Sequence, residues 1–264
     1  QTTTDPLILN SEPWVIPEGF TQHIVSDENN LDIYPDSVDW TDMNTVNETG
    51  KHAGRYLYRT HEVRPVEGVP YSGGAVSVAD LKTGEAEVLA QRADWEALDG
   101  LVWTPWHTLL FAEETITAQL PDPEVPNAQS GMLYELKFVK NDPTTVKEIK
   151  VRPMLGSLSH EGIEIDDEGN VYVIDEDKKG AIYKFVPDNY GDLSSGQLYA
   201  LRVNNGAKTG EAEWVALDMN QVQINARIAA QAVNATPFCR PEDLERIGNT
   251  LYAARTCEAA TNPA

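Results

Sequence analysis

Apolar and polar residues alternate along most of the chain in short runs, a pattern typical of β-strands that bury one face. Glycine, aspartate, asparagine and proline separate the runs and predict tight turns. The predicted strands are Phe20–Val25, Gly54–Val63, Gly74–Asp80, Ala86–Ala90, Leu101–Trp103, Thr108–Glu113, Gly131–Lys140, Lys147–Pro153, Gly162–Ile165, Gly169–Asp175, Gly180–Phe185, Gln197–Val203, Glu213–Ala216 and Thr250–Ala254. Apolar spacing near 3.6 occurs over Val222–Val233, which predicts one short helix.

A degenerate repeat runs through these strands. A glycine followed by leucine or valine and then tyrosine recurs, for example at Val171-Tyr172, Leu198-Tyr199 and Leu251-Tyr252. Repeat units of about 40 residues with several strands each are typical of propeller blades. We therefore predict an all-β chain, a β-propeller of four-stranded blades with one short helix. Residues 1–20 are expected to form an N-terminal arm and residues 21–264 the propeller domain. A β-sandwich is the alternative, but it does not bring side chains from every unit to one point.

The charge balance narrows the function. The 264 residues include 42 Asp and Glu but only 20 Lys and Arg, for a net charge of −22. Such a surface repels nucleic acid and anionic membranes, so neither is an expected partner. No run approaches the ~18 apolar residues of a membrane span. The chain begins at Gln1 with no leader sequence, which favours a mature secreted, periplasmic or extracellular protein.

Two cysteines, Cys239 and Cys257, lie 18 residues apart and flank one strand pattern. A disulfide is the first interpretation and agrees with an oxidising compartment. Two buried thiols are the alternative. A metal site built on the pair lacks nearby histidine or cysteine ligands.

Carboxylates follow several of the predicted strands. The segments are Thr60-His61-Glu62, Ala112-Glu113-Glu114, His160-Glu161-Gly162, Asp175-Glu176-Asp177 and Arg240-Pro241-Glu242-Asp243. Acids at the ends of several strands are a common way to collect hard oxygen ligands around Ca²⁺ or Mg²⁺. Some have simpler explanations: Glu164 and Asp166 alternate with apolar residues and are expected in solvent, and Asp177 suits a hairpin turn.

Arg240 stands beside two of these acids. Its guanidinium is a planar fork suited to phosphate or carboxylate, although a surface ion pair explains it equally well. Cations and an arginine around a developing negative charge are what phosphoryl chemistry requires.

These segments together resemble the PhoX-type alkaline phosphatases, secreted β-propellers that hold a calcium–iron cluster. The similar pieces occur in family order from about residue 45 onward. They are Leu57–Glu62, Thr108–Glu114, His160–Gly162, Tyr183–Val186, Gly196–Tyr199 with Trp214, and the tetrapeptide Arg240-Pro241-Glu242-Asp243.

The resemblance implies roles for particular residues. It places metal ligands at Glu62, Glu161, Asp175 and Glu242, with Glu176 as the alternative register for Asp175, and a phosphate-contacting arginine at Arg240. Further ligand candidates beside them are Glu113, Glu114, His160 and Glu176. The family's iron-binding cysteine falls at Ala112, which removes the thiolate that a soft iron site favours, so calcium is expected and iron is not.

Two hypotheses for function remain open. The chain is a metal-dependent phosphatase acting on phosphate esters, or a non-catalytic extracellular calcium-binding propeller that binds a protein or polymer. The early end at Ala264 implies a fragment of a longer chain or a ring completed by a partner. A lactonase-like propeller with one central calcium is a third reading, but its axial Asn and Asp ligands are hard to place.

Overall fold

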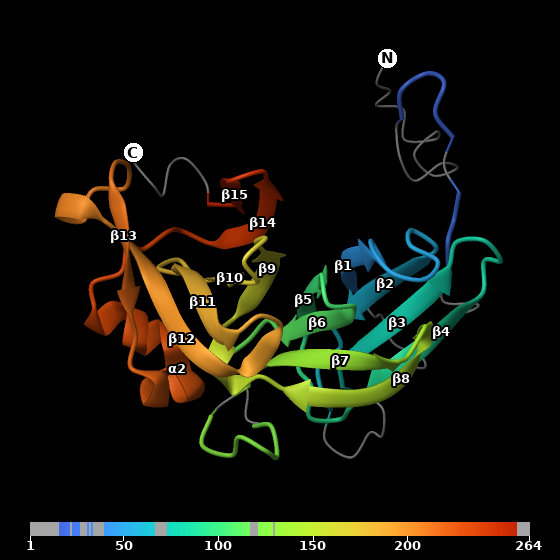
Figure 1. The fold of residues 1–264 in the computed structure, drawn as a ribbon, viewed down its shortest axis with the longest axis horizontal. Helices are drawn as coiled ribbons and strands as arrows, with labels where there is room; N and C mark the ends of the chain where they lie inside the picture. The colour runs from blue at the N-terminus through green and yellow to red at the C-terminus, as the bar shows by residue number, and fades with distance from the viewer. Residues whose placement is uncertain are drawn as a thin grey trace.

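A computed structural model describes residues 16–21, 23–26, 31, 33, 40–66, 73–116, 121–128 and 130–257. The described chain is mostly β-structure, arranged as three antiparallel sheets and one hairpin (Figure 1). The first sheet contains β1 (Thr41–Val46), β2 (Tyr56–His61), β3 (Ala75–Asp80) and β4 (Ala86–Gln91). The second contains β5 (Leu98–Trp103), β6 (Thr108–Glu113), β7 (Leu133–Val139) and β8 (Asp142–Val151).

The third sheet contains β9 (His160–Ile165), β10 (Val171–Asp175), β11 (Ile182–Asn189), β12 (Asp192–Val203) and β13 (Ala212–Ala216). A separate hairpin pairs β14 (Pro241–Ile247) with β15 (Thr250–Arg255). In the sequence, the helix α2 (Met219–Ala232) lies between β13 and β14. Short 3-10 turns occur at Pro153–Leu155 and Asn204–Gly206. In every sheet, strands that follow one another in sequence are hydrogen-bonded neighbours. Each sheet is therefore a simple meander.

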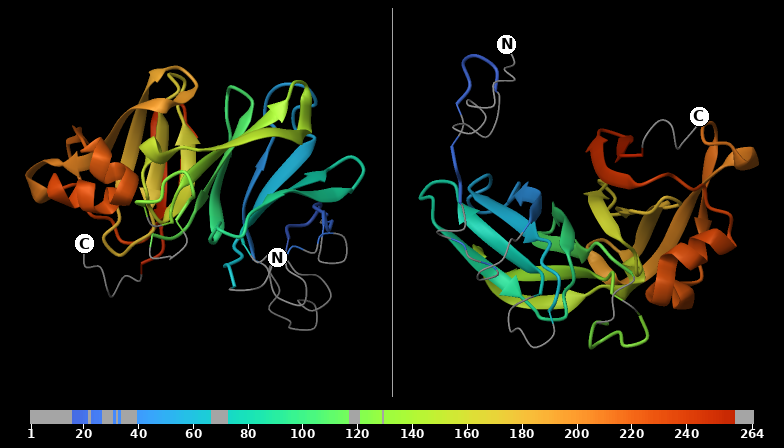
Figure 2. Two further views of the ribbon diagram at one scale, coloured as in Figure 1. Left: turned by 90° about the horizontal axis from the view of Figure 1, so that it is seen from below. Right: turned by 180° about the vertical axis from the view of Figure 1, so that it is seen from behind.

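We call each of the three sheets, and the β14–β15 hairpin, a unit. The first strand of each unit lies toward the middle of the molecule. Strand β5 contacts β1 and β9, and β9 also contacts β14. The sheets stand side by side around these strands in an arc, with α2 on the outer side of the third sheet (Figures 1 and 2). The described residues form no closed ring, so the predicted propeller is not confirmed; what the structure shows is consecutive antiparallel meanders.

Strand β6 explains how neighbouring sheets hold together. Its side chains alternate between two cores: Leu110 and Ala112 join the cluster shared with the third sheet, whereas Leu109 and Phe111 join the cluster shared with the first. All six of its residues are buried. Burying one such large side chain contributes about 1.5–3 kcal/mol. A strand enclosed on both faces accordingly reads as a continuous apolar run rather than an alternation.

The predicted elements agree with the structure in type but not everywhere in extent. Helix α2 starts three residues before the predicted Val222, because the Asp218 side chain accepts a hydrogen bond from the Asn220 amide at 2.9 Å and caps the helix. The predicted strand Phe20–Val25 is wrong for its described residues, which have no regular structure. Strands β1 and β14 were not predicted. Both are rich in polar residues and only partly buried, so no apolar run marks them. Residues 1–15 of the predicted arm lie outside the described residues.

The predicted disulfide is confirmed. Cys239 and Cys257 are bonded, with their Cα atoms 5.8 Å apart, so the alternative of two free thiols is wrong. The bond joins the two ends of the β14–β15 hairpin and lies next to Arg240 in the sequence. A cross-link of this kind restricts the unfolded chain and stabilises the hairpin that carries Arg240 and Glu242.

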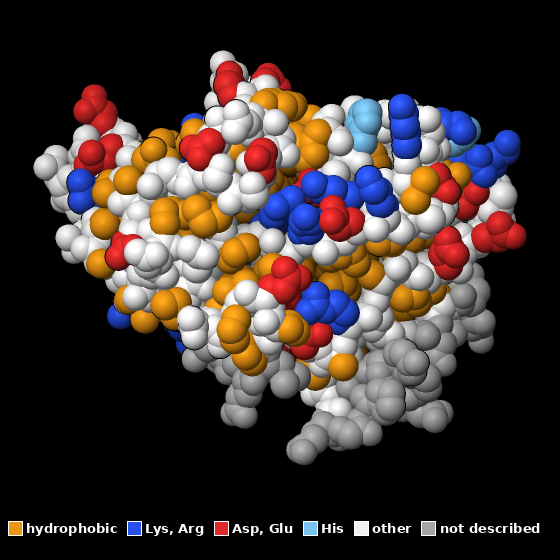
Figure 3. Space-filling view, turned by 60° about the horizontal axis from the view of Figure 1, so that its bottom comes forward, with side chains coloured by type: hydrophobic (Ala, Val, Ile, Leu, Met, Phe, Trp, Pro, Cys, Tyr) orange, Lys and Arg blue, Asp and Glu red, His pale blue; other side chains and the backbone are white. Residues whose placement is uncertain are grey.

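The surface carries both signs of charge despite the net charge of −22. On the face shown in Figure 3, basic side chains gather with acidic ones among them. Two ion pairs lie within strands β7 and β8: Lys137 with the buried Glu135, and Lys150 with Glu148, both exposed. Among the described helices, none combines the length and the apolar character needed to cross a membrane.

Candidate metal centre

One backbone contact repeats at the start of all four units. The residue after the second strand donates its amide to the carbonyl of the residue before the first strand, and this bond defines equivalent positions in the units. The four bonds are Glu62 to Trp40 (2.8 Å), Glu114 to Ala97 (2.9 Å), Glu176 to Ser159 (2.8 Å) and Thr256 to Arg240 (3.2 Å).

This equivalence places the acids in two rows. The second residue of every first strand is acidic: Asp42, Asp99, Glu161 and Glu242. The residue directly after the second strand is Glu62, Glu114 and Glu176 in the three sheets, and Thr256 in the hairpin. The first strands lie next to one another, so both rows meet near the middle of the molecule.

Two glycines allow the first strands to approach closely. A Cβ at Gly100 would lie 2.2 Å from the carbonyl oxygen of Glu161, and one at Gly162 would lie 2.3 Å from the amide nitrogen of Leu244. Each distance is far shorter than a real Cβ contact, so only glycine fits. Because Gly100 follows Asp99 and Gly162 follows Glu161, the glycines bring the acids of neighbouring units together.

Five carboxylates converge as a result, and we call Asp42, Glu62, Asp99, Glu114 and Glu161 the acid cluster. They form two groups that share Asp99: Asp42 with Glu62 and Asp99, and Asp99 with Glu114 and Glu161. Within each group one ligand oxygen per residue lies within 4.8 Å of the others. Asp99 is only 1% exposed, and its Oδ1 has no hydrogen-bond partner among the described residues. A buried oxygen without a donor is costly unless a cation or proton joins it.

The close approach of these buried carboxyl groups raises their pKa values. Burial, followed by the charge of Glu114, raises the pKa of Glu62 from 4.5 to about 8. Burial and the charge of Asp42 raise the pKa of Asp99 from 3.8 to about 9. Burial and the charge of Asp99 raise the pKa of Glu161 from 4.5 to about 11. Without a bound cation these groups hold protons at neutral pH.

A pH-dependent stability follows for the cation-free protein. The unfolded chain releases these protons near their ordinary values of 4.5 and 3.8, whereas the folded chain keeps them until about pH 8 or above. The folded state therefore binds more protons, and stability falls as pH rises through this window. In EDTA the melting temperature should fall between about pH 5 and about pH 9. Saturating calcium should remove most of that fall, and an unchanged slope would contradict a cation site here.

Arg240 lies beside the acid cluster. Its Nε donates to Glu176, and its Nη2 lies 3.1 Å from the Oε1 of Glu242. The charge of Glu161 also acts on the guanidinium, raising the pKa of Arg240 after the larger effect of the Glu176 hydrogen bond. Nη1 has no acceptor among the described residues, and 44% of the side chain is exposed. One edge of this guanidinium is thus held by carboxylates while another faces outward.

Asp175 occupies a different environment from the one implied by the resemblance. Both of its carboxylate oxygens accept hydrogen bonds of 2.6 Å from Arg227 of α2. Asp175 pairs with His160 across the sheet, at the register position that His61 and Glu113 occupy in the other sheets. The position equivalent to Glu62 and Glu114 is Glu176.

His61 and Glu113, which occupy the position of Asp175 in the other two sheets, form hydrogen bonds within their own sheets. Glu113 accepts hydrogen bonds from the amides of Gly131 and Met132, both at 2.9 Å, and His61 lies 2.8 Å from the hydroxyl of Ser77. His160, another predicted candidate, is fully buried, and its Nε2 lies 3.0 Å from the carbonyl of Gly156. None of them belongs to either acid group among the described residues. Adjacent residues of a strand point to opposite faces, which explains the division.

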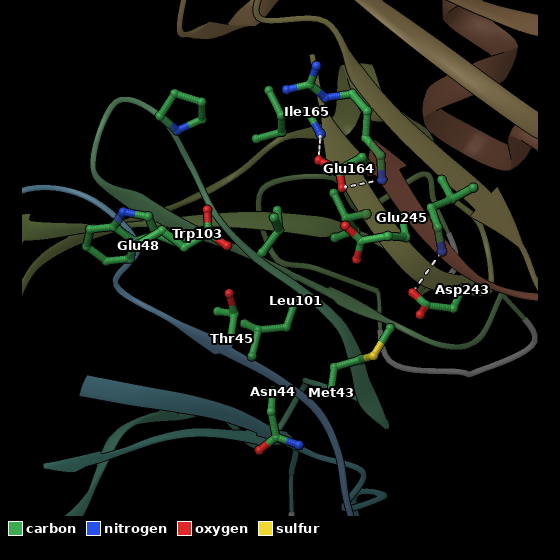
Figure 4. Close-up of a pocket in the computed structure, with 15 residues that line it drawn as sticks. Met43, Asn44, Thr45, Glu48, Leu101, Trp103, Glu164, Ile165, Asp243 and Glu245 are labelled. Atoms are coloured by element: carbon green, nitrogen blue, oxygen red, sulfur yellow. Dashed lines mark hydrogen bonds between the residues drawn. The ribbon is translucent and has the colours of Figure 1, made fainter. Parts of the chain in front are cut away.

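A cavity of about 390 Å³ lies along the first strands, and none of the five acid-cluster residues lines it. Figure 4 shows side chains from all four units around it: Asn44 from β1, Trp103 from β5, Glu164 from β9 and Glu245 from β14. Glu164 accepts a hydrogen bond from the Arg246 amide at 3.1 Å and is half-buried, so the expectation that it is solvated is wrong. The first strands of all four units thus contribute to one cavity, which does not share its lining residues with the acid cluster.

Comparison with known proteins supports a family. The family model described as alkaline phosphatase PhoX matches residues 102–263, which is more than half of the chain. The chain belongs to the PhoX alkaline phosphatase family. This match includes Glu114, Glu161, Glu176, Arg240 and Glu242, while Asp42, Glu62 and Asp99 precede it.

One solved structure is similar to this PhoX-family chain. It is Pseudomonas fluorescens PhoX in complex with vanadate, a transition state analogue, with 18% sequence identity and a TM-score of 0.49. The alignment covers 77% of this chain and 56% of the other, so the chain spans little more than half the length of that protein. Comparison with curated protein sequences finds no match.

The PhoX resemblance placed a cysteine ligand at Ala112, and the surroundings of that residue can now be described. Ala112 is fully buried in the apolar cluster between the second and third sheets and pairs with Leu133 across the strand. Both cysteines of the chain are held in the disulfide. The chain therefore offers no thiolate to this PhoX site, and its acid cluster provides oxygen donors.

Asp42 and Asp99 were missed by the sequence analysis of this PhoX-family chain. Neither follows an apolar strand, since each is the second residue of a first strand. The signal that would have found Asp99 is the pair Asp99-Gly100, which matches Glu161-Gly162 in both charge and glycine. Asp42 is followed by Met43 and carries no such signature.

Proposed function

We propose that this chain is a secreted, calcium-dependent phosphomonoesterase whose sheets are consecutive blades of a propeller. The observation that carries the proposal is the acid cluster, in which Asp99 and its neighbours converge at the middle of a PhoX-family chain. The meander sheets and their adjacent first strands support the propeller. The disulfide supports an oxidising compartment.

The donor set fits calcium. Ca²⁺ takes six to eight oxygen ligands in flexible geometry, and carboxylates are its usual protein donors. We propose two adjoining cation positions: one held by Asp42, Glu62 and Asp99, the other by Asp99, Glu114 and Glu161. Asp99 belongs to both groups and would contribute to both positions, and its Oδ1, which otherwise lacks a partner, is available as a donor. A soft iron site would need sulfur, which this region does not supply.

The side chains around these positions have distinct tasks. Bound calcium would polarise the phosphoryl oxygens and activate the attacking water. The five carboxylates hold the positive charge in place, and the burial of Asp99 keeps bulk water from weakening that attraction. Arg240, fixed on one edge by Glu176 and Glu242, directs its remaining N–H groups to an equatorial oxygen of the phosphate.

Turnover of p-nitrophenyl phosphate, measured after EDTA treatment and again after calcium is added back, tests this function. We expect hydrolysis with calcium and none above background without it, because the carboxylates alone repel a phosphate anion. Calcium binding without turnover would support the non-catalytic alternative. The absence of both would contradict the proposed function.

A further inference from the structure

The two groups of the acid cluster follow a rule that the units repeat. Each group combines the first-strand acid of one unit, the acid after that unit's second strand, and the first-strand acid of the next unit. The first group is Asp42, Glu62 and Asp99; the second is Asp99, Glu114 and Glu161. Applied to the third and fourth units, the rule selects Glu161, Glu176 and Glu242.

A cation already lies at this third position. The guanidinium of Arg240 bonds to Glu176 and lies 3.1 Å from Glu242, and Glu161 in its carboxylate form also favours the positive charge of Arg240. These are the three acids that the rule selects. At the first two positions, no lysine or arginine among the described residues forms an ion pair with the acids. Arg64 pairs with Glu96 instead, and its charge only opposes the rise that burial causes in the pKa of Glu114.

The backbone explains why an arginine reaches this position. Arg240 precedes the first strand of its unit, and Trp40, Ala97 and Ser159 precede the others. Of these four equivalent residues, only Arg240 carries a positive charge. Its backbone has φ 43°, similar to the 48° of Ala97, and its amide donates to the carbonyl of Asp177 at 2.7 Å. The backbone of Arg240 is therefore anchored against the neighbouring unit.

We infer that Arg240 is a built-in cation that replaces a calcium ion at the third position. The inference rests on the proposed function for the first two positions, and it assigns Arg240 a second role beside contacting phosphate. The guanidinium balances Glu176 and Glu242 permanently, whereas the acid cluster acquires its positive charge from solution. An arginine cannot lose its charge at any accessible pH, so this position stays filled when calcium is scarce.

The number of calcium ions bound per chain tests this assignment. Arg240→Ala removes the guanidinium but keeps all three acids, and should bind one more calcium ion per chain than the wild type. Arg240→Ser is a second variant in case the alanine protein misfolds. Serine is chosen because Ser159 occupies the equivalent position in the third sheet. Equilibrium dialysis followed by elemental analysis counts the ions, and circular dichroism checks folding.

Three control variants test whether the extra calcium ion depends on the loss of the Arg240 charge. Arg240→Lys retains a positive charge and should leave the number of ions unchanged. Arg246→Ala removes a guanidinium from β14, the strand that follows Arg240. That guanidinium pairs with Asp167 instead, so its loss should also leave the number of ions unchanged. Adding Glu176→Gln to Arg240→Ala should abolish the extra ion.

The outcomes separate this inference from the proposed function. An increase of one ion in Arg240→Ala supports it, whatever number the wild type binds. An unchanged count in both neutral variants overturns it, while the proposed function stands if the wild type still binds calcium. No calcium in the wild type and one ion in the variant would overturn the proposed calcium sites alone.

Discussion

Asp99→Asn should lower calcium-dependent turnover by at least about 100-fold and remove calcium binding from both proposed positions. Asp99 belongs to both acid groups, so one substitution affects two sites. A neutral amide offers one oxygen in place of a charged carboxylate, and loss even of a residue that only supports a metal ligand costs about 10- to 100-fold. Calorimetric titration with calcium and turnover of p-nitrophenyl phosphate measure the two effects.

The same variant gives a readout that a folding defect could not imitate. In EDTA, Asp99→Asn should be at least as stable as the wild type, because the neutral amide folds without the proton that Asp99 must take up beside Asp42, Glu114 and Glu62. Asp188→Asn, an identical change at an exposed position of β11, should alter neither stability nor calcium binding. Full calcium affinity in Asp99→Asn would remove Asp99 from the proposed sites.

Arg240→Ala should lower kcat/KM for a phosphate monoester by about 100- to 1,000-fold, as loss of one donor to a developing oxyanion does in other enzymes. The loss should fall mainly on kcat, since the guanidinium faces charge that grows in the transition state. Arg240→Lys should recover part of the activity, because lysine keeps the charge but not the planar fork.

Arg246→Ala is the matched control for this prediction. Arg246 lies on the same strand as Glu242, and its side chain bonds to Asp167 and the carbonyl of Gly248. Its loss should leave kcat/KM close to that of the wild type. Equal turnover by Arg240→Ala and the wild type would show that the guanidinium only balances Glu176 and Glu242.

The sequence patterns predicted the strands that alternate or are wholly apolar, the helix and the disulfide. They also singled out Glu62, Glu114 and Glu161, which the fold brings together, because each stands beside an identifiable strand. The first strands β1 and β14 escaped prediction for a physical reason. Their burial is partial and irregular, so neither an apolar run nor a strict alternation marks them.

The choice between Asp175 and Glu176 shows where sequence reasoning stops. Two neighbouring acids at a strand end point to opposite faces, and a shift of one residue exchanges them. Only the pairing of Asp175 with His160, together with the bond from the Glu176 amide to Ser159, fixes the register. The partly exposed Arg227 that pairs with Asp175 comes from α2, about 50 residues later, and no local pattern indicates it.

The central claim is that calcium binds on both sides of Asp99. Anomalous diffraction from calcium-soaked crystals, collected at a long wavelength, tests it most directly. We predict two calcium peaks that share Asp99, one also contacting Asp42 and Glu62 and the other Glu114 and Glu161, with Arg240 rather than calcium between Glu176 and Glu242. Peaks confined to other acids, or no peak at Asp99 at saturating calcium, would contradict the account.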